Sequence, residues 1–169
     1  IEPKWAGYTW NNYKYGNPEN GFSKYNASDA LTVLDLSDDA AHVFMGGKWR
    51  MPTYSEMYEL MESCTWRWVQ RKGMNGYDVI GPNGNSMFLP ASGYYDATNQ
   101  YIFNTHGLYW TSSLSLEQAA YHLNYGVGEA VTMPHGDRFY GRSVRGVFSD
   151  NGNQTPGASY ATIYFNACG

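Results

Sequence analysis

The segment from 53 to 64 carries the clearest helical pattern in the chain. Its apolar side chains recur at intervals of three and four residues: Met57, Leu60, Met61 and Cys64. That spacing places them on one face of an α-helix. Thr53 and Glu56 form the sequence of a capping box, in which each side chain bonds the other residue's backbone N–H. The pattern predicts a helix that begins after Thr53 and ends near Ser63.

A shorter helix is predicted over residues 40–45. Ser37 is a suitable N-cap residue, and the carboxylates of Asp38 and Asp39 favour the positive end of the helix dipole. Gly46 is expected to end this helix, because glycine readily adopts the left-handed conformation that follows a last helical turn.

Beyond residue 64 the hydrophobic period changes to two, which is typical of strands. The predicted strands cover residues 65–70, 77–80, 86–90, 107–113, 119–125 and 142–148, with a further one at 160–165. A Gly-Pro-Asn-Gly-Asn turn at 81–85 predicts a hairpin between the second and third of them. Two early helices followed by many short strands indicate an α+β domain with an antiparallel sheet system.

Residues 1–30 show no helical period, and aromatic side chains alternate there with glycine and proline. The rings belong to Trp5, Tyr8, Trp10, Tyr13, Tyr15, Phe22 and Tyr25. We expect a long loop that packs on the domain through these rings. A loose N-terminal arm is the alternative, although arms seldom carry so many aromatic residues.

The amino-acid composition argues against two classes of function, nucleic-acid binding and insertion into a membrane. Charged residues make up only 15% of the 169 residues, against about 25% in a typical soluble domain, while aromatic residues reach 17%. The net charge of −4, with dispersed Lys and Arg, argues against a nucleic-acid partner. No run approaches 18 consecutive apolar residues, so we expect no membrane insertion. The start at Ile1 shows no leader pattern, and we expect a segment of a larger, multidomain protein.

No common nucleotide-binding, hydrolase or metalloprotease motif occurs in the chain. The histidines, which have no metal-ligand spacing, are His42, His106, His122 and His135. Asp38 and Asp39 serve a helix start better than a metal site shared with Asp35. Glu129 and Asp137, in a glycine-rich region, leave a weak cation site as an alternative. We therefore expect no cofactor and no dedicated metal site.

The two cysteines are too few for a disulfide scaffold or a thiolate zinc site. In an oxidising compartment Cys64 and Cys168 would form one disulfide, and otherwise they are two buried thiols. Cys64 closes the apolar face of the predicted helix, so a structural role is more consistent with its position than a nucleophilic one.

Residues 121–142 carry the strongest binding signal. Aromatic and amide side chains alternate there with turn residues, and such side chains stack on sugars and bond polar ligands. About half of these residues are expected to be core. Arg138, Arg142 and Arg145 are candidates for pairing with an anionic ligand, or for outward strand positions held by local carboxylates.

Several motifs follow one another in a characteristic order along the chain. They are Asp38-Asp39-Ala40-Ala41-His42-Val43, Gly46-Gly47-Lys48-Trp49-Arg50-Met51-Pro52-Thr53, Cys64-Thr65-Trp66-Arg67-Trp68, Tyr109-Trp110-Thr111-Ser112-Ser113 and Gly141-Arg142-Ser143-Val144-Arg145-Gly146-Val147. In this combination the chain resembles the Fibrobacter succinogenes major paralogous domain family of Bacteroidetes, over roughly residues 2–148. The resemblance implies a C-type lectin-like fold, with two helices packed on a small twisted antiparallel sheet with long loops. Residues 1–148 would form this domain and 149–169 a C-terminal extension.

The resemblance also implies a function: a non-catalytic ligand-binding module, extracellular or on the cell surface, whose ligand is a glycan or a protein. In the related variable proteins of diversity-generating retroelements, the ligand face precedes the final Ser-Val-Arg strand. On this chain that face comprises Tyr121, His122, Asn124, Tyr125, His135, Asp137, Arg138 and Tyr140, flanked by Tyr109 and Trp110. One alternative is a structural subunit of an adhesin or pilus. Another is an oxidase similar to formylglycine-generating enzymes. Those enzymes need two cooperating cysteines, and the candidates in this chain, Cys64 and Cys168, do not lie in the corresponding motif region.

The chain departs from the family pattern in two places. Family members begin with a strand that precedes the Glu2-Pro3-Lys4 segment, where this chain starts. We expect residues 161–165 to replace that strand and Cys168 to bond Cys64. The calcium-binding triplets of sugar-binding C-type lectins are also missing, so the resemblance does not carry calcium-dependent sugar binding with it.

Overall fold

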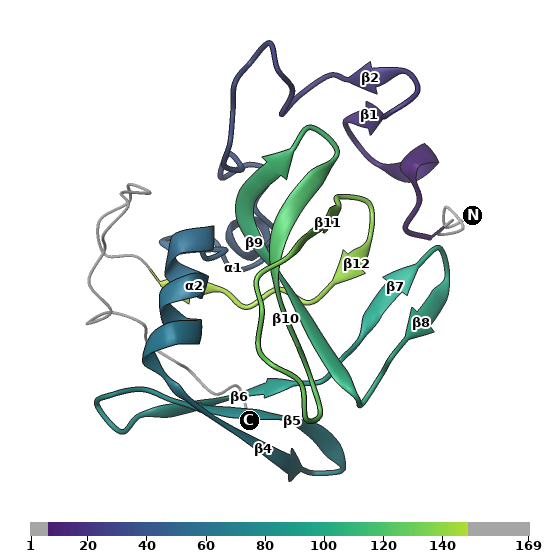
Figure 1. Ribbon diagram of the computed structural model, residues 1–169. Helices are drawn as coiled ribbons and strands as arrows, with labels where there is room; N and C mark the ends of the chain where they lie inside the picture. The colour runs from purple at the N-terminus through teal and green to yellow at the C-terminus, as the bar shows by residue number, and fades with distance from the viewer. Residues whose placement is uncertain (1–6, 149–169) are drawn as a thin grey trace.

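The computed structural model describes residues 7–148 (Figure 1). Its helices are the 3-10 helix η1 (Trp10–Asn12), α1 (Ala40–Met45) and α2 (Tyr54–Ser63). Its strands are β1 (Gly16–Asn17), β2 (Gly21–Phe22), β3 (Trp49–Arg50), β4 (Thr65–Arg71), β5 (Met74–Ile80), β6 (Ser86–Pro90), β7 (Tyr94–Asp96), β8 (Asn99–Tyr101), β9 (His106–Leu116), β10 (Ala119–Gly126), β11 (His135–Asp137), β12 (Gly141–Arg142) and β13 (Val147–Phe148). All paired strands are antiparallel and form small sheets, which confirms the α+β class.

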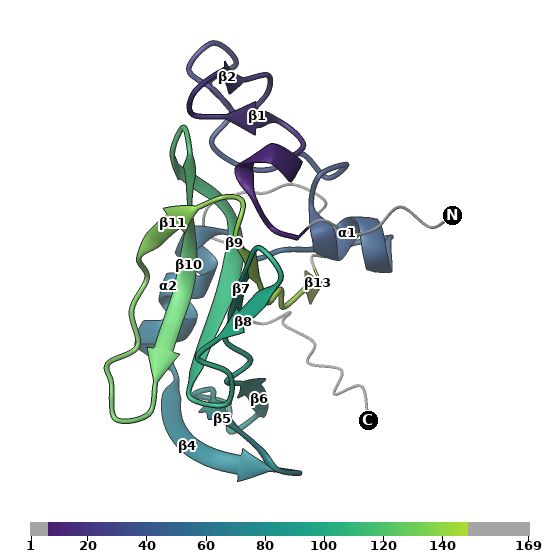
Figure 2. The same cartoon turned by 90° about the vertical axis from the view of Figure 1, so that its right-hand side faces the viewer.

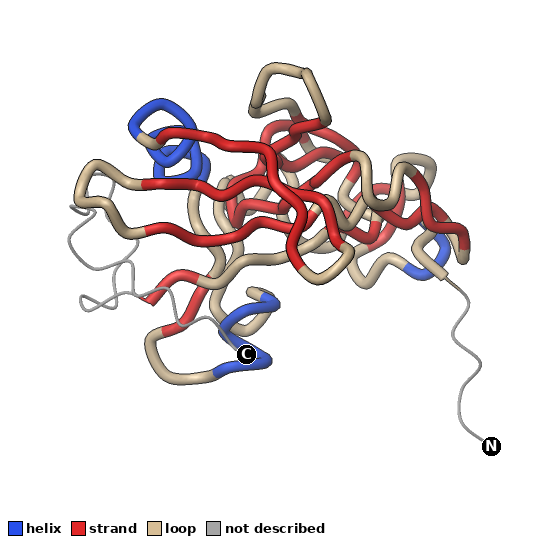
Figure 3. Tube along the Cα trace, turned by 90° about the horizontal axis from the view of Figure 1, so that it is seen from below, coloured by secondary structure: helices blue, strands red, loops and turns tan. Residues whose placement is uncertain are grey.

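The long hairpin of β9 and β10 runs through the middle of the molecule (Figures 1 and 2). His122 lies opposite Trp110, and Leu123 lies opposite Tyr109. Successive side chains of a strand point to opposite faces, so these neighbours enter two different cores. Figure 3 shows the helices at the periphery, with strands filling the middle. The hairpin is therefore covered on both faces.

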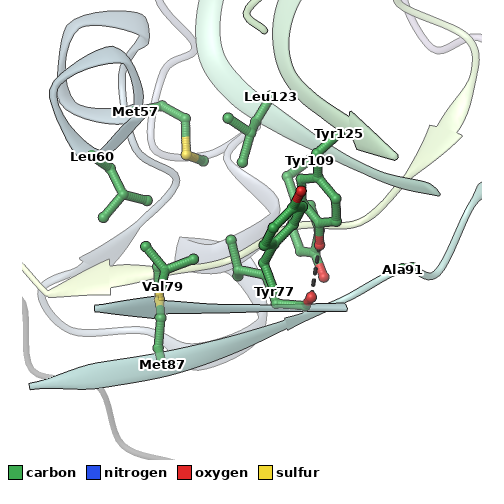
Figure 4. Close-up of a cluster of buried hydrophobic side chains, with 10 residues drawn as sticks. Met57, Leu60, Tyr77, Val79, Met87, Ala91, Tyr109, Leu123 and Tyr125 are labelled. Carbon is green, nitrogen blue, oxygen red and sulfur yellow. Dashed lines mark hydrogen bonds between the residues drawn. The ribbon is translucent and has the colours of Figure 1, made fainter. Parts of the chain in front are cut away.

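The first core lies between one face of this hairpin, α2 and the sheet of β4, β5 and β6 (Figure 4). Its buried residues are Met57, Leu60, Tyr77, Val79, Met87, Leu89, Ala91, Tyr109, Leu123 and Tyr125. Two of its three tyrosines bond their hydroxyls to backbone carbonyls: Tyr125 donates to the carbonyl of Leu89 (2.8 Å) and Tyr109 to that of Pro90 (2.8 Å). Burying these rings therefore leaves neither hydroxyl without a partner.

The second core lies on the opposite face of the hairpin, beneath α1. Its buried residues are Ala41, Met51, Trp110 and Ala120, with Leu34, Leu114 and Tyr140 packed against them. The indole N–H of Trp110 donates to the carbonyl of Tyr140 (3.2 Å), which ties β9 to the segment before β12. This core is smaller than the first and borders the cavity described below.

Both helix starts are anchored by carboxylates. The capping box of α2 is present as predicted, and the Glu56 carboxylate also pairs with both terminal nitrogens of Arg50 (2.7 and 2.6 Å). The N-cap of α1 is Asp39, which corrects the prediction of Ser37. Asp39 takes this role because its fully buried carboxylate accepts from the N–H groups of His42 (3.0 Å) and Met51 (2.8 Å), which join α1 to the segment after β3.

The N-terminal segment packs through its rings, as the sequence predicts. The ring of Trp10 lies 5.4 Å from that of Phe22 and 5.1 Å from that of Phe139, between centroids. The short β1–β2 hairpin holds the segment above the β9–β10 hairpin (Figure 1). The N-terminal segment and the region around β9 and β12, which are distant in sequence, therefore line the same cavity.

The prediction of one strand over 142–148 is wrong. β12 pairs with β7, and β13 pairs with β3, while the backbone between them crosses from one sheet to the other. The crossing is tight, since a Cβ placed on Gly146 would lie 2.3 Å from the Met45 side chain. The predicted strand at 160–165 lies outside the described residues. Among helices of residues 7–148, none combines the length and apolar character that a bilayer crossing requires.

Replacing Leu123 by alanine should destabilise the fold by about 2–5 kcal/mol, because Leu123 is fully buried in the first core. Urea unfolding followed by circular dichroism measures the change. Val127→Ala, at an exposed aliphatic position just beyond β10, is the control and should stay within about 0.5 kcal/mol of the wild type. Equal losses in the two variants would contradict the placement of Leu123.

Candidate functional site

A cavity of about 870 Å³ lies between the N-terminal segment, the start of α1 and the face of the hairpin that carries the second core. This volume falls within the range of small-molecule sites. The aromatic residues of its lining are Tyr8, Tyr13, Tyr15, Trp110, Phe139 and Tyr140. Its basic residues are Lys14, Arg138 and Arg142. Rings and cationic groups therefore make up much of the wall.

Three of the residues predicted for the ligand face line this cavity: Trp110, Arg138 and Tyr140. Trp110 reaches it from β9 because it lies on the face away from the first core. Arg138 and Tyr140 follow β11, in the turn that leads to β12. His122 lies next to this group, with its ring 5.5 Å from the Trp110 ring, and is itself 4% exposed.

Tyr109 and Tyr125 do not belong to a ligand face, which corrects the prediction. Tyr125 is 0% exposed and Tyr109 is 4% exposed, and both belong to the first core. The reason is the period of two: these odd-numbered positions face α2 and the β4–β6 sheet, opposite Trp110 and His122.

The remaining predicted residues lie outside the cavity lining. Tyr121 packs against Tyr54 at the start of α2, at 4.5 Å between ring centroids, and its ring is 6.4 Å from that of His135. Asn124 exchanges backbone hydrogen bonds with Thr132. Asp137 is half-buried in β11. The structure therefore does not gather these side chains at one site with Trp110.

Sequence reasoning missed the contribution of the N-terminal segment and of Arg142. Tyr8, Tyr13 and Tyr15 form part of the wall because the ring cluster folds their segment over the hairpin. Their dense aromatic spacing signals packing but does not reveal the partner. Arg142 is singled out in the sequence only as one of three arginines with two possible roles.

Arg142 is held by stacking and by one neutral acceptor. Its guanidinium carbon lies 4.1 Å from the centroid of Trp110 and 5.3 Å from that of Tyr140. Its Nη1 donates to Nδ1 of His122 (2.8 Å). Burial, followed by the nearby charge of Arg142, lowers the pKa of His122 to about 3, so the imidazole is neutral near pH 7. Burial also lowers the pKa of Arg142 to about 10, which leaves the guanidinium charged near pH 7.

Arg138 is more deeply enclosed. It is 8% exposed, and its guanidinium carbon lies 4.4 Å from the Phe22 centroid and 5.3 Å from that of Tyr13. Nη1 donates to the carbonyl of Tyr25 at 3.3 Å. Its Nε and Nη2, together with Nε of Arg142, are buried and have no hydrogen-bond partner among the described residues. Enclosed donors of this kind are rare in folded proteins.

The carboxylate that lines the cavity is Asp38, and its acceptor capacity is filled. It pairs with Lys14 (2.8 Å) and Lys24 (2.7 Å) and accepts from the hydroxyls of Tyr25 (2.6 Å) and Tyr15. Although burial opposes its ionisation, these partners hold the pKa of Asp38 well below its usual range. Asp38 therefore anchors the N-terminal segment to the start of α1.

Other candidate groups do not form a site around the cavity. Among residues 7–148, His, Cys, Asp and Glu side chains do not gather in threes as a metal site requires. Glu129 lies against His106 (3.1 Å), away from the cavity lining. Cys64 follows α2 and packs against the first core, where burial raises the pKa of its thiol. Its predicted partner, Cys168, lies outside the described residues.

Comparison with known proteins gives no match of any of three kinds: no family model, no curated protein and no solved structure.

Replacing Asp38 by asparagine should destabilise the protein by about 2 kcal/mol at pH 7, because charge-assisted hydrogen bonds to the N-terminal segment are lost. A carboxylate with a depressed folded-state pKa stabilises above its unfolded pKa of about 4, and that stability is lost as the pH falls below it. The difference between wild type and Asp38→Asn should therefore shrink between pH 4.5 and pH 2.5 in urea unfolding.

Glu19→Gln, at an exposed acidic position of the same segment, is the matched control and should change stability little at either pH. A difference between wild type and Asp38→Asn that stays constant or grows on acidification would contradict the role given to Asp38.

Proposed function

We propose that this chain is a non-catalytic ligand-binding module with a C-type lectin-like fold, a member of the Fibrobacter succinogenes major paralogous domain family that acts outside the cell or at its surface. The family, fold and location rest on the motif resemblance. The binding function rests on the cavity beside Trp110, whose wall combines aromatic rings with guanidinium groups that have unpaired donors. A wall of this composition suits polar ligands with apolar faces, of which saccharides are the leading example.

The state of the reactive groups supports binding over catalysis. A general acid or base at pH 7 needs a pKa near that pH and access to a substrate. Asp38 is fully engaged by its cationic and hydroxyl partners, and His122 is enclosed with a pKa of about 3. Cys64 lies with the first core, on the other face of the hairpin. The groups bordering the cavity are thus arranged to hold a ligand.

The ligand site is tested by a glycan array probed with the labelled full chain, with and without calcium. Tyr140→Ala removes a ring from the cavity wall and should weaken every array hit at least about tenfold, as truncation of an interface anchor does. Tyr121→Ala is the matched control, because this half-buried tyrosine packs against Tyr54 and does not line the cavity. It should bind within about twofold of the wild type.

Thermal unfolding of both variants establishes that they are folded at the array temperature. Equal binding by Tyr140→Ala and wild type would move the site elsewhere on the chain. If the glycan array gives no hits and a parallel peptide array does, the ligand is a protein and not a glycan. Silence on both arrays would contradict the proposed function.

A further inference from the structure

Arg138, which is buried, and Arg142, which is half-buried, border the cavity without a carboxylate partner. Arg138 and Arg142 take part in none of the ion pairs formed among the described residues. Three of their nitrogens are enclosed without a hydrogen-bond partner there. Arg50 is also buried and also has an unpartnered Nε, but it differs because its two terminal nitrogens bond the carboxylate of Glu56. Burial of a charged group is costly unless the charge is compensated.

Neighbouring charges do not supply that compensation. Asp38 is already shared between Lys14 and Lys24. Asp137 acts on Arg142, and Asp29 and Glu117 act on Arg138, only through longer-range electrostatic interaction. The side of the cavity nearest these arginines therefore carries uncompensated positive charge. An anionic ligand would bind to guanidinium groups that already stack on aromatic rings.

We propose that the ligand of this cavity is an acidic saccharide, in which the carboxylate of a hexuronate unit pairs with Arg138 and Arg142 and the sugar ring packs on the aromatic wall. This inference rests on the proposed function and specifies the ligand class. A guanidinium presents a planar fork of N–H donors that matches a carboxylate. The rings of Tyr13 and Tyr140 supply apolar surface beside the two arginines, while Thr9 and Asn12 add polar groups for sugar hydroxyls.

An acidic peptide fits this site less well. Peptides that bind beside a sheet gain affinity by adding a strand to an unpaired edge. On the cavity side of the hairpin, the β9 backbone is already paired: Trp110 N–H donates to Ser143 (2.9 Å), Ser112 to Pro52 (2.8 Å) and Leu114 to Thr32 (2.8 Å). Recognition there must come from side chains, which favours a compact ligand with its own ring and hydroxyls.

Isothermal titration of the full chain with sodium digalacturonate, neutral galactobiose and an N-acetylated Glu-Glu dipeptide tests the inference. Digalacturonate should bind saturably, at least tenfold more tightly than galactobiose and the dipeptide. Its affinity should fall several-fold between 50 and 300 mM NaCl, because the attraction is partly electrostatic. These comparisons use the unaltered protein and do not depend on whether any variant folds.

Variants then locate the carboxylate. Arg138→Gln and Arg142→Gln should each weaken digalacturonate binding at least tenfold, with galactobiose affected far less. Arg142→Lys keeps the charge but loses the fork, and should fall between wild type and Arg142→Gln. Arg67→Gln is the matched control, because this exposed arginine on β4 pairs with Asp78 away from the cavity, and it should bind like the wild type.

The outcomes separate the two proposals. If galactobiose binds as tightly as digalacturonate and Tyr140→Ala abolishes both, the acidic ligand is overturned and the binding cavity stands. Tightest binding of the dipeptide would overturn the saccharide in favour of an acidic peptide. If Arg67→Gln weakens digalacturonate binding as much as Arg142→Gln does, the assignment of the ligand to the cavity is overturned. No binding of any probe, together with silent glycan and peptide arrays, would overturn both proposals.

Discussion

The β9–β10 hairpin is buried on both of its faces, and the rest of the structure depends on this constraint. Adjacent residues of each strand point to opposite faces of the hairpin. Tyr109 and Leu123 pack against α2 and the β4–β6 sheet. Trp110 and His122 lie on the face that borders the cavity. Exposed antiparallel hairpins commonly keep one polar face in water. In this chain α1 and the N-terminal segment cover the face that carries Trp110. The cavity lies between these elements and the hairpin.

Covering the second face places polar groups in a poorly solvated environment. His122 stays neutral and accepts from Arg142, and the guanidinium of Arg142 lies over Trp110. Arg138 lies in the same way over Phe22. Stacking on rings offsets part of the desolvation of a guanidinium but leaves its positive charge unneutralised. The chemical character of the cavity thus follows from the way the fold closes this face, and the proposed acidic ligand would complete the missing charge.

Local signals in the sequence predict several elements that depend on neighbours in the chain. The capping box of Thr53 and Glu56 marks the start of α2, and the Gly-Pro-Asn-Gly-Asn turn marks the β5–β6 hairpin. The prediction of Ser37 as the N-cap of α1 is wrong because the carboxylate of Asp39 also accepts from a donor distant in sequence, the N–H of Met51. Similarly, residues 142–148 have strand character, yet two different sheets compete for their ends.

The candidate site was less predictable for a related reason. Alternation indicates which residues of β10 share a face, but it does not reveal which face meets a ligand when both are buried. Tyr125 and Trp110 have equally suitable rings, and only the packing of α2 against one side separates them. The contributions of Tyr13 and Arg138 arise from contacts between opposite ends of the described chain. The pattern of a single segment does not encode such contacts.

Amide hydrogen exchange tests the central claim most directly, because it reports the opening free energy of individual backbone hydrogen bonds of the hairpin. The amides of Trp110 and His122, which donate to Ser143 and Pro134, should open only with global unfolding. In Leu123→Ala, a change confined to the opposite face, their opening free energies should fall by the same amount as the global stability. Protection of Trp110 and His122 that is unchanged in this variant, or lower than global stability in the wild type, would contradict a hairpin that supports both faces as one unit.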